Sequence, residues 1–209
     1  MNVGVDLRQS FGPSRDQGPR PTCLVFATSA AHEAGRGDAR YLSVEYLYFM
    51  GAKRSHGDPK LGLSPRAIWD ALQKDGQPHE TGWPYKPKAP AVSKWKAPSV
   101  APVYKASLAF ASRTVAEVVA LLQNGKPVIL GLALTKRFYI PDGEARVLPD
   151  PGAVETAKHA VLAVGTGTDP NGQYLLIRNS WGETWGDAGH AWLHEEYVRE
   201  RVLTTGVIQ

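Results

Sequence analysis

The residue of this chain that could act as a nucleophile is Cys23, its only cysteine. It lies six residues after Gln17, at the end of a Gly- and Pro-rich run and directly before the apolar residues 24–27. We expect a helix to begin there, and the unpaired N–H groups and dipole of a helix N-terminus favour the thiolate, the reactive form of cysteine. A lone cysteine is more often an inert core residue, so two further runs decide the interpretation.

These later runs supply a base and a group that could orient it. His159 stands at the head of an apolar segment, 158–165, with the character of a strand, and Asn179 follows the strand-like residues 174–177. The Asp-Pro-Asn-Gly sequence at 169–172 is typical of a turn, so the two segments can pair and bring the imidazole beside the carboxamide. Each residue alone favours a structural interpretation. Together with the thiol they form a nucleophile, a base and an orienting group.

The runs resemble the motifs of the papain-like cysteine peptidases, the superfamily of papain and the cathepsins. The chain has, in the same order, a Gln-Gly loop, a cysteine opening a helix, a His-Ala-Val strand and an Asn-Ser-Trp-Gly-x-x-Trp-Gly run. His159 and Asn179 lie 136 and 156 residues after Cys23, close to the spacing of papain-like enzymes. Other segments, from 42–47 to 126–131, also resemble the family, so the resemblance covers nearly the whole chain.

The resemblance implies a role for each of four catalytic residues. Cys23 would attack the amide carbonyl and His159 would carry the proton to the leaving amine. Asn179 would hold the imidazole through its second nitrogen. The backbone N–H of Cys23 and the side-chain amide of Gln17 would donate to the oxyanion.

Two further residues are implied to support the substrate. Trp181 would cover the hydrogen bond between His159 and Asn179 and keep water out, and Gly62 would pair its backbone with an extended peptide. The expected partners are therefore a protein or peptide substrate and a proteinaceous inhibitor or pro-segment in the same site.

The chain also departs from the family pattern. Arg20 and Leu24 stand where relatives commonly have a second cysteine and a tryptophan, and Lys158 replaces the Asp or Asn that often precedes the histidine. The disulfides of secreted relatives are absent, and residues 1–8 lack the pattern of a signal peptide. We therefore expect either a cytoplasmic enzyme, in the producer or in a target cell, or an excised domain.

The composition excludes several other classes of protein. The chain has 209 residues, 43% of them hydrophobic, and its net charge of +4 is spread along the sequence, so we expect no nucleic-acid partner. No apolar run approaches the roughly 18 residues of a membrane helix. One cysteine cannot build a thiolate zinc site, and His190 and His194 lack a completing carboxylate, so neither a metal nor a cofactor is expected. Gly165-Thr166-Gly167 is interpreted as a strand-end turn.

Local patterns predict an α+β fold with a helical lobe over about 16–100 and a strand-rich lobe over about 101–209, and the family resemblance places the active-site cleft between them. Thr22 is a possible N-cap of the first helix and Gly35 its stop, and Ser64 and Thr114 are expected to cap the helices that follow them. Residues 84–102 hold many prolines and lysines and are interpreted as a solvated crossing. The helices are expected over 23–34, 43–52, 65–74 and 114–124, and the strands over 127–134, 159–165, 173–178 and 189–194.

The function that these observations favour is that of a cysteine endopeptidase acting through a thioester on Cys23. An acyl or peptidyl transferase, a deamidase and a toxin-type effector would use the same nucleophile and remain open. A catalytically inactive binding module is a further alternative, which the filled catalytic positions disfavour.

Overall fold

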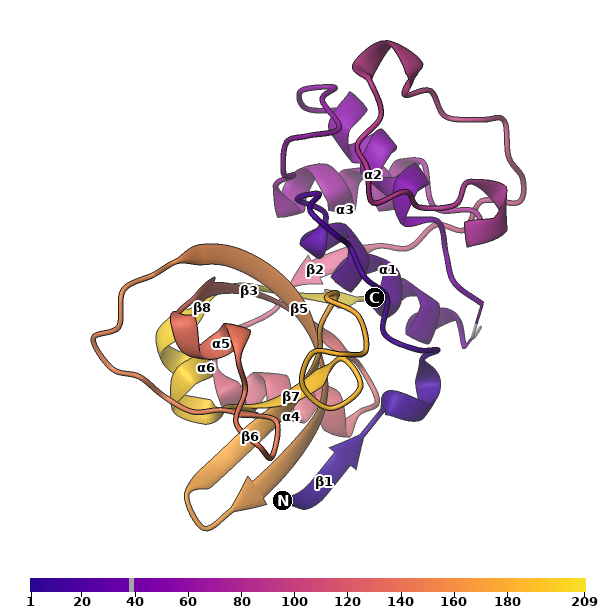
Figure 1. The fold of residues 1–209 in the computed structure, drawn as a ribbon. Coiled ribbons are helices and arrows are strands. Elements are labelled where there is room, and N and C mark those ends of the chain that lie inside the picture. Colours follow the sequence, from indigo (N-terminus) through magenta and orange to yellow (C-terminus); the bar gives the residue numbers. More distant parts are fainter. Residues whose placement is uncertain (38–39) are drawn as a thin grey trace.

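The computed structural model describes residues 1–37 and 40–209. Its strands are β1 (Asn2–Asp6), β2 (Leu108–Phe110), β3 (Val128–Leu134), β4 (Arg146–Val147), β5 (Ala157–Asp169), β6 (Gly172–Arg178), β7 (His190–His194) and β8 (Val202–Ile208). They form one curved sheet in the order β2-β8-β3-β5-β6-β7-β4, and β1 pairs with the second half of β5 (Figure 1). The long strand β5 therefore connects β1, β3 and β6.

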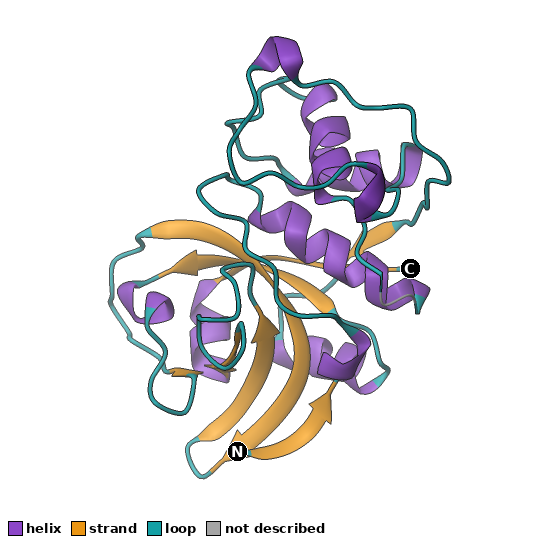
Figure 2. Ribbon diagram, turned by 45° about the vertical axis from the view of Figure 1, so that its right-hand side comes forward, coloured by secondary structure: helices purple, strands orange, loops and turns teal. Residues whose placement is uncertain are grey.

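The helices are α1 (Cys23–Arg36), α2 (Val44–Lys53), α3 (Pro65–Lys74), α4 (Val115–Gln123), α5 (Lys136–Tyr139) and α6 (Glu195–Arg201), and short 3-10 helices lie at Arg8–Ser10, Glu80–Gly82 and Val92–Lys94. The helices form two groups: α1, α2 and α3 pack together, and α4 and α6 pack on the strands. Helices α2 and α3 pack on each other, and α1 lies between them and the sheet (Figure 2). The fold is thus α+β with a helical and a strand-rich part, as expected.

Side-chain caps fix the starts of three helices. The hydroxyls of Ser43, Ser64 and Thr114 each accept a hydrogen bond from the backbone N–H three residues later, at 3.1 to 3.3 Å. Such a bond satisfies one of the N–H groups that a helix leaves unpaired. The predicted caps at Ser64 and Thr114 are confirmed.

Thr22 is the N-cap residue of α1, as predicted, whereas the predicted end of the helix at Gly35 is wrong. Thr22 occupies the N-cap position but makes no capping bond, because its hydroxyl lies 2.9 Å from the hydroxyl of Tyr85. At the other end Gly35 is helical, and the helix ends at Gly37, which adopts the left-handed conformation with a φ of 63°. That conformation has almost no steric cost for glycine.

The core has three clusters of buried apolar residues. One fills the sheet side around Leu130, a second joins α2 and α3 around Ile68, and a third lies between α1 and the sheet around Ala31 and Leu162. The third cluster fixes α1 against β5, and Cys23 packs at its margin. The nucleophile is therefore held by the contact between the two parts of the fold.

The interpretation of residues 84–102 as a solvated crossing is wrong for Trp95. Its side chain is only 5% exposed, packs beside Tyr48 and Phe49, and donates from its indole nitrogen to Glu45 at 2.7 Å. The flanking lysines are exposed, as the sequence pattern predicted. The pattern did not predict that Trp95 is buried and anchors the segment to α2.

Gly165-Thr166-Gly167 is also not a turn, because all three residues lie inside β5. There β5 pairs with β1 on one edge and with β6 on the other. A Cβ at position 165 would collide with the carbonyl oxygen of Val5. The glycine thus allows the close approach of β1, a pairing of residues far apart in the chain that no local pattern indicates.

Truncating Trp95 tests its role as an anchor. Trp95→Ala should lower the free energy of unfolding by about 3–5 kcal/mol, because it leaves a cavity and removes one of the donors to the buried Glu45 carboxylate. Val92→Ala is the control, since Val92 is 59% exposed in the same 3-10 helix and should change stability by less than about 0.5 kcal/mol. Urea unfolding measures both, and equal small effects would restore the solvated interpretation.

Candidate active site

Cys23 is the first residue of α1 and is half-buried. The first helical hydrogen bond runs from the N–H of Phe26 to the carbonyl of Thr22, so the N–H groups of residues 23–25 precede the helical ladder. The backbone N–H groups of Cys23 and Leu24 face the thiol and act to lower its pKa. The helix start therefore offers donors to the sulfur, as the sequence predicted.

Burial nevertheless has the larger effect and raises the pKa of Cys23. A helix terminus contributes at most about 2 kcal/mol, so it cannot by itself ionise a thiol in an apolar setting. A further donor is the backbone N–H of Ala160 on β5, which also acts to lower the pKa. Because Ala160 follows His159 directly, this contact places the sulfur beside the backbone that carries the expected base.

His159 and Asn179 are joined by a hydrogen bond of 2.7 Å between Nε2 and Oδ1. The backbone N–H of Ser180 also donates to the same Oδ1 at 2.8 Å, which identifies that atom as the amide oxygen. An amide oxygen only accepts, so Nε2 of a neutral His159 must carry the proton. The lone pair is then on Nδ1, which makes Nδ1 the basic nitrogen.

Aromatic rings enclose this pair. The ring of Trp181 lies with its centroid 4.6 Å from that of His159, and Phe138 meets the imidazole edge-on at 6.0 Å. Trp181 is itself stacked on Tyr139 at 5.4 Å. Burial lowers the pKa of His159 to about 4, with the Asn179 bond acting in the opposite direction. Alone, the imidazole would thus stay neutral at pH 7.

Gln17 is buried in the loop before α1. The hydroxyl of Ser180 donates to its Oε1 at 2.7 Å, and its Nε2 donates to the carbonyl of Arg20 at 2.8 Å. The backbone N–H of Gln17 donates to the Ser180 carbonyl at 2.9 Å. Nε2 has a second hydrogen, which leaves one donor for an oxyanion.

Gly62 lies beside the catalytic loop. A Cβ at this position would be 3.8 Å from Pro21, so the glycine is in contact range of the residues before Cys23. Nδ1 of His56 accepts from the N–H of Asp58 at 3.0 Å, which leaves the proton on Nε2 to be donated to the Gly62 carbonyl at 3.2 Å. The expected substrate-pairing carbonyl thus already has one partner within the chain.

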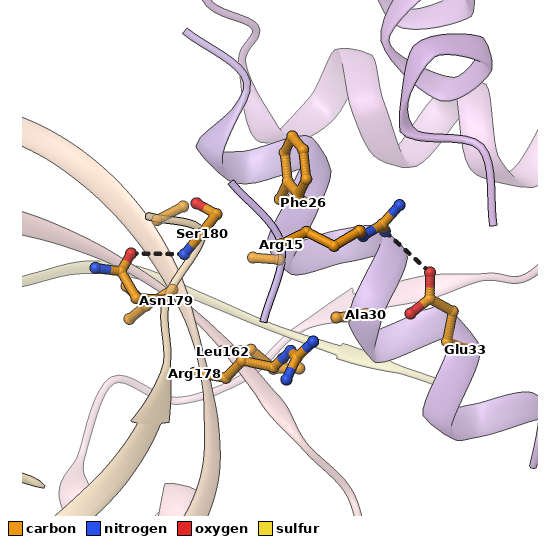
Figure 3. Close-up of a pocket in the computed structure, with 11 residues that line it drawn as sticks. Arg15, Phe26, Ala30, Glu33, Leu162, Arg178, Asn179 and Ser180 are labelled. Atoms are coloured by element: carbon orange, nitrogen blue, oxygen red, sulfur yellow. Dashed lines mark hydrogen bonds and ion pairs between the residues drawn. The ribbon is translucent and has the colours of Figure 1, made fainter. Parts of the chain in front are cut away.

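A small cavity lies behind the catalytic residues, between α1 and the sheet (Figure 3). Its volume of about 20 Å³ suits one water molecule. Arg15 crosses it to pair with Glu33 at 3.1 Å, and Arg178 enters from the end of β6. Arg15 and Arg178 thus line the cavity at the junction between α1 and the sheet.

Sequence reasoning missed two residues that shape the site. Ser180 was recognised only as part of a motif, yet its N–H orients Asn179 and its hydroxyl orients Gln17. Arg20 was noted only as a departure from the family, yet its carbonyl holds the Gln17 amide. A polar residue next to a catalytic amide was the available signal for Ser180, whereas nothing local indicated the role of Arg20.

Residues 1–37 and 40–209 form neither a metal-binding cluster nor a membrane-spanning helix. No three His, Cys, Asp or Glu side chains of that set cluster so as to hold a metal ion. His190 and His194 are buried, and each lies within hydrogen-bond distance of a backbone carbonyl. No helix in that set is long and apolar enough to cross a membrane.

The fold and this arrangement are those of a class of thiol enzymes with a cysteine at the start of a helix, a histidine on a neighbouring strand and an asparagine directly after the next strand. Comparison with known proteins agrees, since the family model for papain family cysteine proteases matches residues 2–207. The chain belongs to the papain family of cysteine proteases.

Individual relatives are distant in sequence. Cysteine proteinase 3 of Entamoeba histolytica is 28% identical over 89% of this chain and 60% of its own length, and Peptidase 1 of Dermatophagoides farinae is 28% identical over 90% and 59%. The chain thus spans about three fifths of the length of these curated relatives.

Solved structures share the fold. Xylellain, a cysteine protease from Xylella fastidiosa, has a TM-score of 0.80 at 24% identity and covers 99% of this chain and 86% of its own. A Carica candamarcensis cysteine protease in complex with E-64 has a TM-score of 0.76 at 20% identity over 100% and 99%. The proform of the ragweed allergen Amb a 11 has a TM-score of 0.77 at 20% identity over 100% and 66%.

Removing the imidazole should expose the intrinsic pKa of the thiol. In His159→Ala, alkylation of Cys23 by iodoacetamide should require alkaline pH, because burial raises the pKa of Cys23 and the imidazolium that opposes this is gone. The unaltered protein should react at pH 5–6. Rates are measured by mass spectrometry across pH, and identical profiles for the two proteins would show that His159 does not activate the thiol.

Proposed function

We propose that this chain is a cysteine endopeptidase that hydrolyses peptide bonds through a thioester on Cys23. The observation that carries the proposal is the 2.7 Å bond between His159 and Asn179, which leaves Nδ1 as the basic nitrogen. Family membership and the placement of Cys23 at the start of α1 support it.

In the first half-reaction the Cys23 proton moves to Nδ1 of His159, and the thiolate attacks the carbonyl carbon. The resulting oxyanion accepts from the backbone N–H of Cys23 and from the second hydrogen of the Gln17 amide. When the intermediate collapses, the C–N bond breaks and His159 gives its proton to the departing amine. A thioester remains on the sulfur.

In the second half-reaction a water molecule gives a proton to His159 and attacks the thioester carbonyl. A second oxyanion forms at the same donors, the C–S bond breaks, and the carboxylic acid product leaves while His159 returns the proton to the sulfur. A transferase would differ only in the acceptor, because an amine would take the place of water.

Charge explains why the nucleophile and base act together. Burial disfavours a lone thiolate and a lone imidazolium, which raises the pKa of Cys23 and lowers that of His159 to about 4. Proton transfer between them creates both charges at once without changing the net charge of the site. The two groups should therefore titrate as a pair.

The substrate is proposed to be an extended peptide that passes Gly62 on one side of Cys23 and Trp181 on the other. The E-64 complex and the proform of the structural relatives support a site that accepts peptide-like inhibitors or a pro-segment. Digestion of a peptide library, analysed by mass spectrometry beside a Cys23→Ala control, tests the activity. Intact peptides with both proteins would contradict it, and ligated products would favour the transferase.

Loss of the oxyanion donor should slow turnover without altering the thiol. Gln17→Ala should lower kcat by roughly 100- to 1000-fold, the usual effect of removing one such donor. The rate of Cys23 alkylation should change by less than about twofold, since the alkylation of a thiol creates no oxyanion. A parallel loss of alkylation would show that Gln17 supports the nucleophile instead.

Redox conditions should affect activity and leave stability alone. The chain has one cysteine and can form no internal disulfide, so a reductant should not change Tm. It should protect activity by keeping Cys23 from oxidation. We propose on this basis that the enzyme works in a reducing compartment, and a Tm that falls on reduction would indicate an intermolecular disulfide and contradict this proposal.

A further inference from the structure

The loop that carries Gln17 and Cys23 is attached to α2 by a buried ion pair. The Nη1 of Arg20 donates to Oε2 of Glu45 at 2.6 Å and its Nη2 donates to Oε1 at 3.0 Å. The two side chains are 2% and 3% exposed. The bidentate geometry fixes the direction of the guanidinium as well as its distance from the carboxylate.

Neighbouring groups hold both partners. Glu45 also accepts from the indole N–H of Trp95 at 2.7 Å, and Arg20 also donates to the carbonyl of Lys86 at 2.7 Å. The guanidinium carbon lies 5.0 Å from the ring centroids of both Tyr48 and Tyr85. Taking a charge pair out of water is costly, so it requires such additional bonds to persist.

The backbone of Arg20 connects this ion pair to catalysis. Its carbonyl oxygen accepts from Nε2 of Gln17 at 2.8 Å and from the N–H of Thr22 at 2.8 Å. Arg20 therefore orients both the Gln17 amide, which would face the oxyanion, and Thr22, which precedes Cys23. Any rotation of the loop at Arg20 would turn the free N–H of Gln17 away from the oxyanion.

We propose that Arg20 is a positioning residue, and that its ion pair with Glu45 holds the Gln17 amide in the orientation that stabilises the oxyanion. Arg20 stands where relatives commonly have a second cysteine. In this chain the loop is attached to α2 by an ion pair, which does not depend on redox state. The catalytic part of this inference rests on the proposed peptidase function, whereas the orientation of Gln17 does not.

The variant that tests this inference is Arg20→Met with Glu45→Gln. It removes both charges together, keeps an acceptor for Trp95 and retains the volume of the aliphatic stem of the arginine, so no unpaired charge is buried. We expect kcat to fall by about tenfold or more, KM to change by less than about threefold, and the rate of Cys23 alkylation to stay within about twofold. Arg20→Lys, which keeps the charge but not the bidentate fork, should give an intermediate loss.

Two comparisons separate positioning from a general structural role. When Gln17→Ala is combined with the double variant, the ion-pair change should reduce kcat by less than about twofold, because its effect passes through Gln17. The matched control is Arg54→Met, which breaks the 2.7 Å ion pair of Arg54 with Asp75 at the other end of α2 and should leave kcat unchanged. Full additivity with Gln17→Ala, or an unchanged kcat in the folded double variant, would overturn the inference.

A measurement without substrate keeps this inference distinct from the proposed function. The side-chain amide signal of Gln17 in a ¹⁵N NMR spectrum is identified by its loss in Gln17→Ala. It should shift or broaden in the double variant and in Arg20→Lys, and stay in place in Arg54→Met. A signal that is the same in all three would overturn the positioning role even if no peptide is cleaved, whereas a shifted signal without peptidase activity would sustain it and contradict only the proposed reaction.

Discussion

The hydrogen bond from Nε2 of His159 to Asn179 is the constraint on which the site depends. It decides which imidazole nitrogen is basic, and the orientation of the carboxamide is decided in turn by the N–H of Ser180. β5 and β6, which bring these residues together, pair directly with each other, so the tautomer follows from the register of the sheet. The ring of Trp181 lies 4.6 Å from that of His159, where we propose that it shields the bond from water.

Burial imposes a second condition, because it works against the charge of each reacting group. The thiol and the imidazole would both be neutral if each stood alone. Reactivity therefore requires that the two be held together, by the packing of α1 against β5 and by the donors around the sulfur. In the proposed mechanism the loop before α1 adds the oxyanion donor, the Gln17 amide, which bonds to Ser180 and to Arg20.

The sequence predicted what depends on local pattern. The helix from Pro65 to Lys74 and the strand from Val128 to Leu134 follow from capping residues and apolar runs. Contacts between distant residues were not predictable, which is why Thr22 was expected to cap α1 although Tyr85 engages its hydroxyl, and why the pairing of β1 with β5 was missed. Cys23, His159 and Asn179 followed from residue types and turn signals, and the family resemblance added Gln17, Gly62 and Trp181. The attachment of Arg20 to Glu45 required the structure.

The most direct test of this account is to titrate the imidazole of His159 by NMR, with Cys23 free and with its sulfur blocked as a methyl disulfide. In the blocked protein the lone imidazole should stay neutral down to about pH 4, since burial lowers its pKa. In the free enzyme it should be protonated near neutral pH, because the thiolate compensates its charge. Identical titrations in the two forms would contradict the proposed shared proton.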